Sequence, residues 1–306
     1  MDAFNPQELK KLYIPLNDSH KGQNGKLLII GGSQLFHAAS LWALTIASRV
    51  VDMVFYSSVQ ENNAIVHELK KEFRNGIVVP REDLENYVEE ADCILIGPGM
   101  VRTHVQNLQF KVQNLEEINK LADEGEQSYW LTKYLLEKYP QKKWVIDAGA
   151  LQMMEPEWLL QLNGNVAITP HPGEFERVKV KIKDLGLKKK IEQVELKKQI
   201  EFFAKEFTCI VLLKGEEDTI CSAEKSVSIS GGNAGMTKGG TGDVLSGLVA
   251  ALACNNDLFL AATAGAYFNK KAGEALFKKV GYYFNASDLA QEIPVVMKQL
   301  LIYVSA

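Results

Sequence analysis

One glycine-rich segment contains the side chains best suited to chemistry. It runs from Gly231 to Gly247, GGNAGMTKGGTGDVLSG, and seven of its residues are glycine. An apolar run follows directly and predicts a buried helix over Asp243–Cys254. The free N–H groups and the dipole at the start of a helix attract phosphate, and glycine lets a phosphate approach the backbone closely. The segment is therefore a candidate phosphate site.

Asp243 lies in the first turn of this predicted helix. A carboxylate among N–H groups that receive phosphate makes chemical sense if it takes a proton from the group that attacks the phosphorus atom. The alternative is structural, because Asp is favoured in the first turn of any helix. The GTGD motif alone leaves both interpretations open, and it matches neither the Walker A spacing nor the dinucleotide-binding fingerprint.

Other polar residues directly follow predicted buried strands. Asp147 ends VID and is either a helix cap or a carboxylate at the floor of a cleft, near a metal or a substrate hydroxyl. In TPHPGEFERV, two prolines and a glycine fix a turn that displays His171 and Glu174 for binding. Glu174 either holds a hydrated magnesium ion or caps the helix that begins there. Lys214, in VLLKG, is typical of both a plain turn and a phosphate contact.

Apolar strands and amphipathic helices alternate along most of the chain, which predicts a parallel sheet with crossover helices. The expected strands are Lys26–Ile30, Met53–Tyr56, Ile77–Pro80, Cys93–Ile96, Trp144–Ile146, Val166–Thr169 and Ile210–Leu213, with Thr219–Cys221 and Val227–Ile229 as antiparallel edge strands. The expected helices include Ala38–Val50, Ala64–Phe73, Leu84–Glu90, Glu157–Leu162, Val194–Phe207, Leu260–Phe277 and Ser287–Leu301, and Met100–Pro140 is expected to hold one or two more. Lys179–Lys190 is expected to be a basic surface loop.

The positions of these strands predict where a ligand binds. Five buried strands end in Gly, Pro, Asp, His or Lys, and ligands of open parallel sheets bind outside the carboxyl ends of the strands. The pattern predicts one long crevice. Neither a linker-like segment nor an internal repeat is present, so we expect a single domain over residues 1–306.

Composition restricts the class of protein. The net charge of −4 gives no reason to expect nucleic acid or an anionic membrane as a partner. The four cysteines form no CxxC pair, which favours reduced buried thiols in a cytoplasmic protein and makes zinc improbable. The first fifteen residues lack the apolar core of a signal peptide, and no segment has the length and apolarity of a membrane span.

Six motifs in order suggest a family. They are GGS…AAS, ILIGPGM, VIDAGAL, TPHPGEFERV, VLLKG and GMTKGGTGDVLSG. Together, over about residues 22–300, they resemble the ADP/ATP-dependent NAD(P)H-hydrate dehydratases of the ribokinase-like superfamily, whereas GGTGD alone would indicate only the superfamily. The resemblance implies a three-layer α/β/α fold around a mostly parallel sheet. It also implies the stand-alone dehydratase, without the epimerase domain of fused members.

The resemblance also implies a reaction. These enzymes phosphorylate the ring hydroxyl of the S epimer of hydrated NADH or NADPH with ADP or ATP, and loss of phosphate restores the reduced cofactor. Asp243 would be the base. The hydrate would contact Ala39, Gly99, His171 and Asp243. The nucleotide would contact Lys214, Gly215, Glu216, Glu217, Asp218, Gly239, Gly240, Thr241 and Gly242. Magnesium would bridge the phosphates, with Glu174 in its outer shell. A homotetramer is also implied.

Two departures and two alternatives accompany this expectation. His37 stands where many members have glycine, and Met100–Pro140 is longer than expected, which suggests a lid or an oligomer contact. One alternative is a kinase of the same superfamily that acts on a vitamin-precursor alcohol such as hydroxyethylthiazole and releases a stable phosphoester. TPHPGEFERV together with VIDAGAL favours the dehydratase. The other alternative is a nucleotide-binding module without catalysis, which the carboxylate of Asp243 disfavours.

Overall fold

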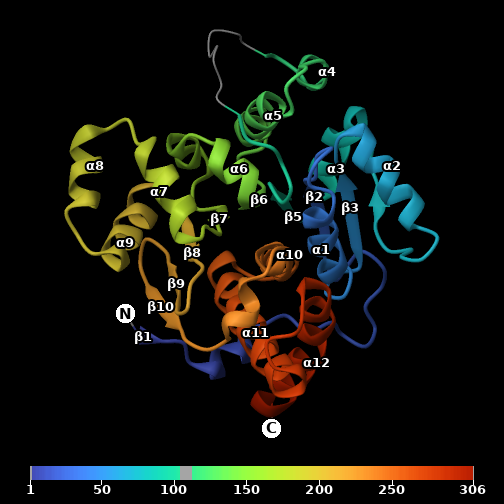
Figure 1. Cartoon of the computed structure of the whole chain (residues 1–306), viewed down its shortest axis with the longest axis vertical. Coiled ribbons are helices and arrows are strands. Elements are labelled where there is room, and N and C mark those ends of the chain that lie inside the picture. Colours follow the sequence, from blue (N-terminus) through green and yellow to red (C-terminus); the bar gives the residue numbers. More distant parts are fainter. Residues whose placement is uncertain (1, 104–111, 306) are drawn as a thin grey trace.

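The computed structural model describes residues 2–103 and 112–305, and their strands form one ten-stranded sheet (Figure 1). Its order is β1-β10-β9-β8-β7-β6-β5-β2-β3-β4. Only β9 runs antiparallel to its neighbours among the described strands. The strands are β1 (Asp2–Ala3), β2 (Lys26–Ile30), β3 (Met53–Ser57), β4 (Ile77–Val78), β5 (Cys93–Ile96), β6 (Lys143–Ile146), β7 (Val166–Ile168), β8 (Ile210–Leu213), β9 (Asp218–Cys221) and β10 (Ser226–Ile229).

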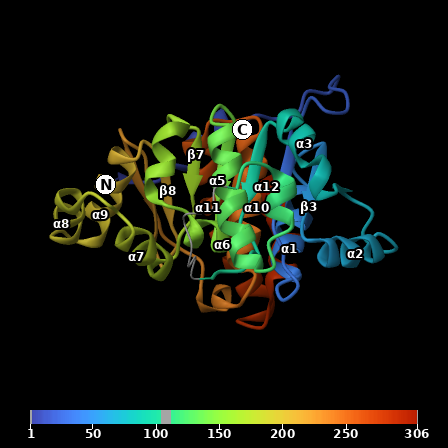
Figure 2. The ribbon, with the colours of Figure 1, turned by 90° about the horizontal axis from the view of Figure 1, so that it is seen from above.

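Helices cover both faces of this sheet, as the two perpendicular views show (Figure 1, Figure 2). The α-helices are α1 (Ala38–Ala47), α2 (Gln60–Leu69), α3 (Leu84–Glu90), α4 (Leu115–Asn119), α5 (Glu124–Lys138), α6 (Ala148–Met153), α7 (Pro172–Val180), α8 (Leu185–Glu192), α9 (Leu196–Glu206), α10 (Thr241–Ala253), α11 (Leu258–Val280) and α12 (Ala286–Ser305). The 3₁₀ helices are η1 (Pro6–Lys11), η2 (Arg81–Asp83), η3 (Pro156–Leu162) and η4 (Ala234–Thr237).

Two hydrophobic cores, one on each face, explain the continuous apolar runs of the strands. In β2, Leu27 and Ile29 belong to the core formed with α1, α10, α11 and α12, while Leu28 and Ile30 belong to the core formed with α3, α5, α6, α7 and α9. All four side chains are fully buried, and each contributes about 1.5–3 kcal/mol of hydrophobic stabilisation. A strand buried on both faces must be apolar at every position, because successive side chains point to opposite faces.

The structure confirms most of the predicted elements. The strands β2, β5 and β8 and the helix α3 have the predicted bounds, and β9 is antiparallel as expected. The predicted edge position of β10 is wrong, because β1 pairs with it in parallel. The segment Met100–Pro140 holds α4 and α5, while the part of that prediction over residues 104–111 lies outside the described residues.

The predicted surface loop over Lys179–Lys190 is also wrong. Helix α8 occupies part of it, beginning behind the cap of Asp184, whose Oδ1 accepts from the N–H groups of Gly186 and Leu187. Two lysines of the segment are engaged rather than solvated. Lys179 is buried, and Lys181 donates to the carbonyls of residues 152–154 at the end of α6. Lysine side chains can satisfy the last carbonyls of a helix, so this basic segment stabilises the fold.

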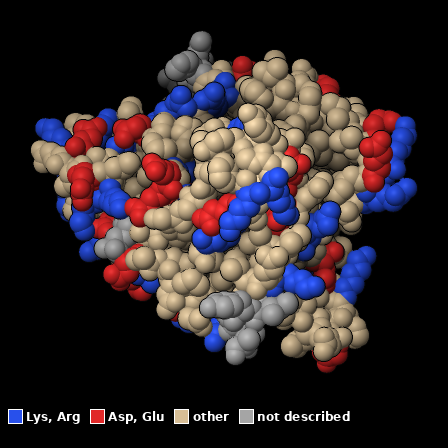
Figure 3. Space-filling view, turned by 60° about the horizontal axis from the view of Figure 1, so that its bottom comes forward, with Lys and Arg blue, Asp and Glu red and all other residues tan. Residues whose placement is uncertain are grey.

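Three further observations concern the surface charges, the length of the helices and the thiols. On the face shown in Figure 3, basic and acidic side chains are interspersed, so that face carries no continuous field of one sign. No helix of the described chain is long and apolar enough to cross a bilayer. The four cysteines are buried and unpaired, which confirms that part of the prediction.

Candidate active site

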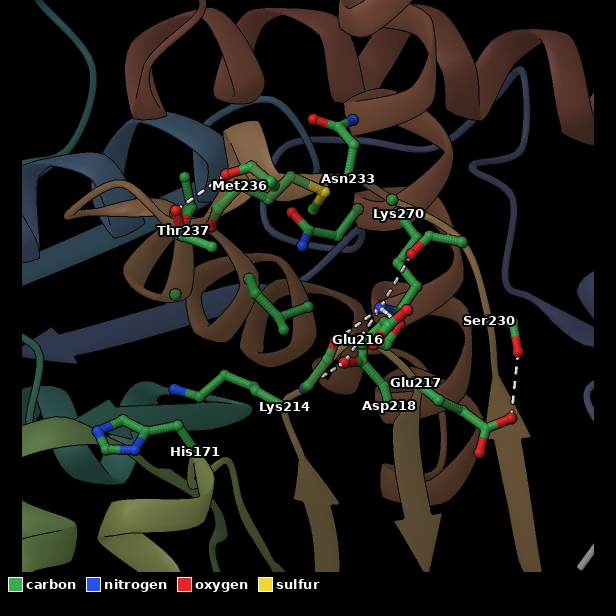
Figure 4. Close-up of a pocket in the computed structure, with 18 residues that line it drawn as sticks. His171, Lys214, Glu216, Glu217, Asp218, Ser230, Asn233, Met236, Thr237 and Lys270 are labelled. Atoms are coloured by element: carbon green, nitrogen blue, oxygen red, sulfur yellow. Dashed lines mark hydrogen bonds and ion pairs between the residues drawn. The ribbon is translucent and has the colours of Figure 1, made fainter. Parts of the chain in front are cut away.

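A cavity of about 880 Å³ opens beside the carboxyl ends of β7 and β8 (Figure 4). Its walls come from the loop after β7, the turn between β8 and β9, the Gly231–Thr237 segment, and the facing sides of α10 and α11. It is lined by His171, Lys214, Gly215, Glu216, Glu217, Asp218, Ser230, Gly231, Gly232, Asn233, Ala234, Met236, Thr237, Thr241, Gly242, Leu245, Asn269 and Lys270. A cavity of this volume accommodates a nucleotide-sized ligand.

The first turn of α10 forms one wall of this cavity. Gly240 precedes the helix with a φ of +94°, and a Cβ there would lie 2.2 Å from the ring of Trp42, so only glycine fits. Thr241 donates its hydroxyl to the carbonyls of Met236 and Lys238, which fixes the loop. No side chain caps the helix, and the N–H of Gly242, which lines the cavity, is available to an anion. This geometry suits a phosphate group.

Asp243, next to the cavity-lining Gly242, belongs to a cluster of three carboxylates around one ammonium group. The Nζ of Lys214 lies 2.9 Å from Oδ1 of Asp147 and 3.9 Å from Oε2 of Glu174. Burial raises the pKa of Asp243 to about 7, helped by the negative charges of Asp147 and Glu174 and opposed by Lys214. A carboxylate with this pKa can act as a general base near neutral pH.

Lys214 lies deeper in the site than the sequence indicates. It lines the cavity, and its Nζ lies 3.4 Å from the position that a Cβ on Gly242 would take. Burial alone would lower the pKa of Lys214, but the charges of Asp147 and Glu174 outweigh this effect and raise it. Lys214 is therefore a permanent cation between the carboxylates and the start of α10. Asp147 occupies the cap position of α6 but makes no side-chain cap bond, so its carboxylate serves Lys214 instead.

His171 and Glu174 cap α7 reciprocally, which is one of the two roles predicted for Glu174. Nδ1 of His171 accepts from the N–H groups of Gly173 and Glu174, while Oε2 of Glu174 accepts from the N–H of His171. Because Nδ1 accepts these bonds, we assign the proton of the neutral ring to Nε2. His171 is half exposed, and its Nε2–H is able to donate to a ligand in the cavity.

The remaining predicted hydrate positions lie at the neighbouring strand ends. Gly99 has a φ of +74°, and a Cβ there would lie 3.2 Å from the Cβ of Ala39, so the loop after β5 packs closely on the start of α1. His37 precedes α1, and its Nδ1 lies 3.2 Å from Oδ1 of Asn62. Neither Ala39 nor Gly99 lines the cavity, which is built on the ends of β7 and β8. The sequence predicts one crevice along five strand ends, whereas this cavity lies at the ends of only two of those strands.

The predicted nucleotide segment forms one side of the cavity and is held there by a residue that the sequence did not single out. Lys270, on α11, donates to the carbonyls of Gly215, Glu216 and Gly231. Its Nζ also lies 3.4 Å from Oδ1 of Asp218, which in turn accepts from the N–H of Gly215. In Figure 4, Lys270 reaches the turn from the helix side. The only sign of this role in the sequence is that Lys270 is a charged residue within an alanine-rich, buried helix.

The carboxylates do not form a protein cage for a metal ion. Within the described parts of the chain, no three His, Cys, Asp or Glu side chains are placed to hold one. The acidic groups that approach each other do so around Lys214. This donor set fits magnesium that is carried by nucleotide phosphates and keeps most of its waters, because such an ion needs few protein carboxylates.

A comparison with known families decides the identity. The family model described as NAD(P)H-hydrate dehydratase matches residues 27–295. The chain belongs to this family. It is 34% identical over 305 residues to the ADP-dependent (S)-NAD(P)H-hydrate dehydratase of Nitrosopumilus maritimus, with 95% of each chain covered. It is 33% identical to the bifunctional NAD(P)H-hydrate repair enzyme of Methanocaldococcus jannaschii, covering 95% of this chain and 52% of that protein. The chain therefore spans about half the length of the bifunctional relatives.

Solved structures show the same fold. A ribokinase-like superfamily protein of Enterococcus faecalis superposes with a TM-score of 0.77 at 24% identity, covering 98% of this chain and 96% of that chain. The ADP/ATP-dependent NAD(P)H-hydrate dehydratase of Bacillus subtilis, co-crystallised with ATP/Mg²⁺, gives 0.73 at 21% identity, with 98% of each chain covered. The predicted ribokinase-like α/β/α fold is confirmed.

Proposed function

We propose that this member of the dehydratase family returns the S epimer of hydrated NADH or NADPH to the reduced cofactor with ADP or ATP. The observation that carries the proposal is the position of Asp243. Its carboxylate has a pKa of about 7, lies in the first turn of the uncapped helix α10, and is close enough to the partly buried Lys214 to be influenced by its charge. A base next to an anion site is the arrangement that phosphoryl transfer to a hydroxyl requires.

In the proposed first step, Asp243 removes the proton of the ring hydroxyl. The hydroxyl oxygen forms a bond to the terminal phosphorus of the nucleotide, and the bond from that phosphorus to the remaining nucleotide breaks. The N–H groups around Gly240–Gly242 stabilise the transferring phosphoryl group, and Lys214 stabilises the negative charge that gathers there. In the second step the ring C–O bond breaks, phosphate leaves, and loss of a proton from the adjacent ring carbon restores the double bond.

We assign the remaining predicted residues to binding. Ala39, Gly99 and His171 would receive the hydrate, with Nε2–H of His171 as a donor. The turn Lys214–Asp218 and the glycine-rich loop Gly239–Gly242 would receive the nucleotide; Thr241 and Gly242 of this loop line the cavity, whereas Gly239 and Gly240 do not. Magnesium bound with the nucleotide would neutralise phosphate charge, and Glu174 and Asp147 would accept hydrogen bonds from its waters.

The direct test follows the formation of NADH from NADHX, with ADP and ATP supplied in turn. The proposal requires phosphate release that depends on NADHX and equals the NADH formed. The kinase alternative predicts instead a stable phosphoester from hydroxyethylthiazole or a related alcohol, with no NADH from NADHX. A chain that binds ADP but turns over neither substrate would be the non-catalytic module.

We also propose one domain over residues 1–306, since all the described strands belong to one sheet. We also propose a homotetramer, which rests on the family, and a cytoplasmic location, which rests on the four unpaired buried cysteines. Light scattering coupled to gel filtration measures the first, and cell fractionation the second. A monomer at working concentration would contradict the tetramer.

A further inference from the structure

Two arginines meet on one neutral acceptor beside the carboxylate cluster. Oε1 of Gln152, on α6, accepts from Nη1 of Arg102 at 2.5 Å and from Nη1 of Arg177 at 2.7 Å. Both arginine side chains are exposed. We propose that Arg102 and Arg177 form a binding site for a phosphate group of the dinucleotide substrate, and this inference rests on the proposed function.

The first argument is that no carboxylate balances the positive charges of Arg102 and Arg177. Throughout residues 2–103 and 112–305, no carboxylate lies within ion-pair distance of Arg102 or Arg177. Two guanidinium groups that share one amide oxygen repel each other, and a neutral acceptor does not offset that repulsion. Each group has five donors, and one of them is used at Gln152. An anion that accepts from both guanidinium groups would complete the arrangement, and phosphate matches their fork geometry.

The second argument is that both arginines lie close in the chain to predicted hydrate-binding positions. Arg102 lies three residues after Gly99, and Arg177 lies on α7, which His171 caps. The backbone around Arg102 is closely packed, because Met100 lies against Gly149 and the Arg102–Thr103 backbone lies against Gly125. Neither arginine lines the nucleotide cavity, whose cations are Lys214 and Lys270. The pair therefore belongs to the substrate side.

The third argument is the connection to the catalytic cluster. Nε2 of the same Gln152 donates to Oε1 of Glu174 at 2.8 Å, and Glu174 lies 3.9 Å from the Nζ of Lys214. One glutamine side chain thus separates the arginines from the carboxylates around Asp243. A dinucleotide whose hydrated ring reaches Asp243 carries its phosphates a short distance away. NADHX offers only the pyrophosphate, whereas NADPHX also offers a 2′-phosphate.

The test replaces Arg102 and Arg177 with glutamine, singly and together, and measures KM for each substrate. We expect KM for the hydrate to rise about tenfold in each single variant and about a hundredfold in the double variant, because charge-assisted hydrogen bonds to phosphate are lost. KM for ADP and kcat should change less than about twofold. If KM rises for NADPHX alone, the arginines bind the 2′-phosphate. If KM rises equally for NADHX, they bind the pyrophosphate.

Three controls separate binding from a structural role. Arg49→Gln removes an exposed arginine between α1 and β3, near the amino end of β3 and away from the carboxyl strand ends that carry the site, and should leave every constant unchanged. The substitutions Arg102→Lys and Arg177→Lys keep the charge and should retain part of the affinity for the hydrate that the glutamine variants lose. Inorganic pyrophosphate should compete with the hydrate in the wild-type enzyme and more weakly in the double variant. Thermal unfolding identifies any variant that fails to fold, in which case the single and lysine variants still decide.

The proposal is overturned if the folded glutamine variants keep the wild-type KM for both hydrates. It is also overturned if KM for ADP rises as much as KM for the hydrate in the glutamine variants. A third contradicting result would be lysine variants with the same rise in KM for the hydrate and the same fall in kcat as the glutamine variants. A wild-type protein that forms no NADH from NADHX would instead refute the proposed function, so the two failures are distinguishable.

Discussion

The pH dependence of the reaction follows from the surroundings of Asp243. Only the ionised carboxylate can accept a proton, and burial together with Asp147 and Glu174 raises its pKa to about 7. With that pKa, roughly 90% of the enzyme is active at pH 8 and roughly 10% at pH 6. We therefore expect kcat/KM for the hydrate to fall about tenfold between pH 8 and pH 6, and about tenfold again by pH 5.

The assay measures the initial rate of NADH formation from NADHX at saturating ADP, after subtraction of the reaction without enzyme. The terminal phosphate of ADP also ionises near this pH, so a midpoint alone does not identify Asp243. Asp147→Asn provides the control. It removes a negative charge that raises the pKa of Asp243, so the midpoint should move to lower pH by up to about one unit. Lys214→Met removes the opposing positive charge and should move the midpoint to higher pH.

The ionisation of free ADP in solution would not follow these substitutions. A flat profile in the wild-type enzyme, or a midpoint near pH 4 as for an exposed aspartate, would refute the role of Asp243 as the base. Midpoints that stay at the wild-type value in both variants would refute the electrostatic explanation of the raised pKa.

Three further variants test the same site. Asp243→Asn should reduce kcat by about 10²–10⁴-fold while calorimetry still detects ADP binding, and retained turnover would contradict the assignment. Because the pKa of Asp243 is raised from 3.8 to about 7 on folding, its ionisation lowers the free energy of unfolding between about pH 4 and pH 7. The asparagine variant should therefore be more stable to urea at pH 8, by at most about 4 kcal/mol, and not at pH 4. Lys270→Met should raise KM for ADP about tenfold by releasing the turn that it holds, whereas the neighbouring Lys271→Met, which breaks only a half-exposed pair with Glu274, should not. Gly240→Ala should abolish activity and lower the melting temperature, because its Cβ would overlap the ring of Trp42 at a φ of +94°; an active, equally stable variant would show that the loop is free to move.

The local elements could be predicted because their signals are local. A strand buried on both faces must be apolar throughout, and β2, β5 and β8 follow that rule residue for residue. Helix α8 was missed because its lysines and glycine resemble a solvated loop, whereas its cap at Asp184 and the packing of Ile191 in the core favour the helix. Strand β1 was missed because two residues carry no periodicity, and only pairing with β10 creates the strand.

The sequence by itself determined the alternation of strands and helices, the glycine-rich turn before α10, and the ordered motifs that assign the family. It did so because each of these signals is a pattern of residue type over a short stretch of chain. Only the tertiary structure decides that Lys214 pairs with Asp147 and that Lys270 donates to the turn between β8 and β9. It also decides that Arg102 and Arg177 both donate to Gln152. Those contacts join residues far apart along the chain. The pKa of Asp243 depends on burial and on distances between such residues, which no stretch of sequence contains.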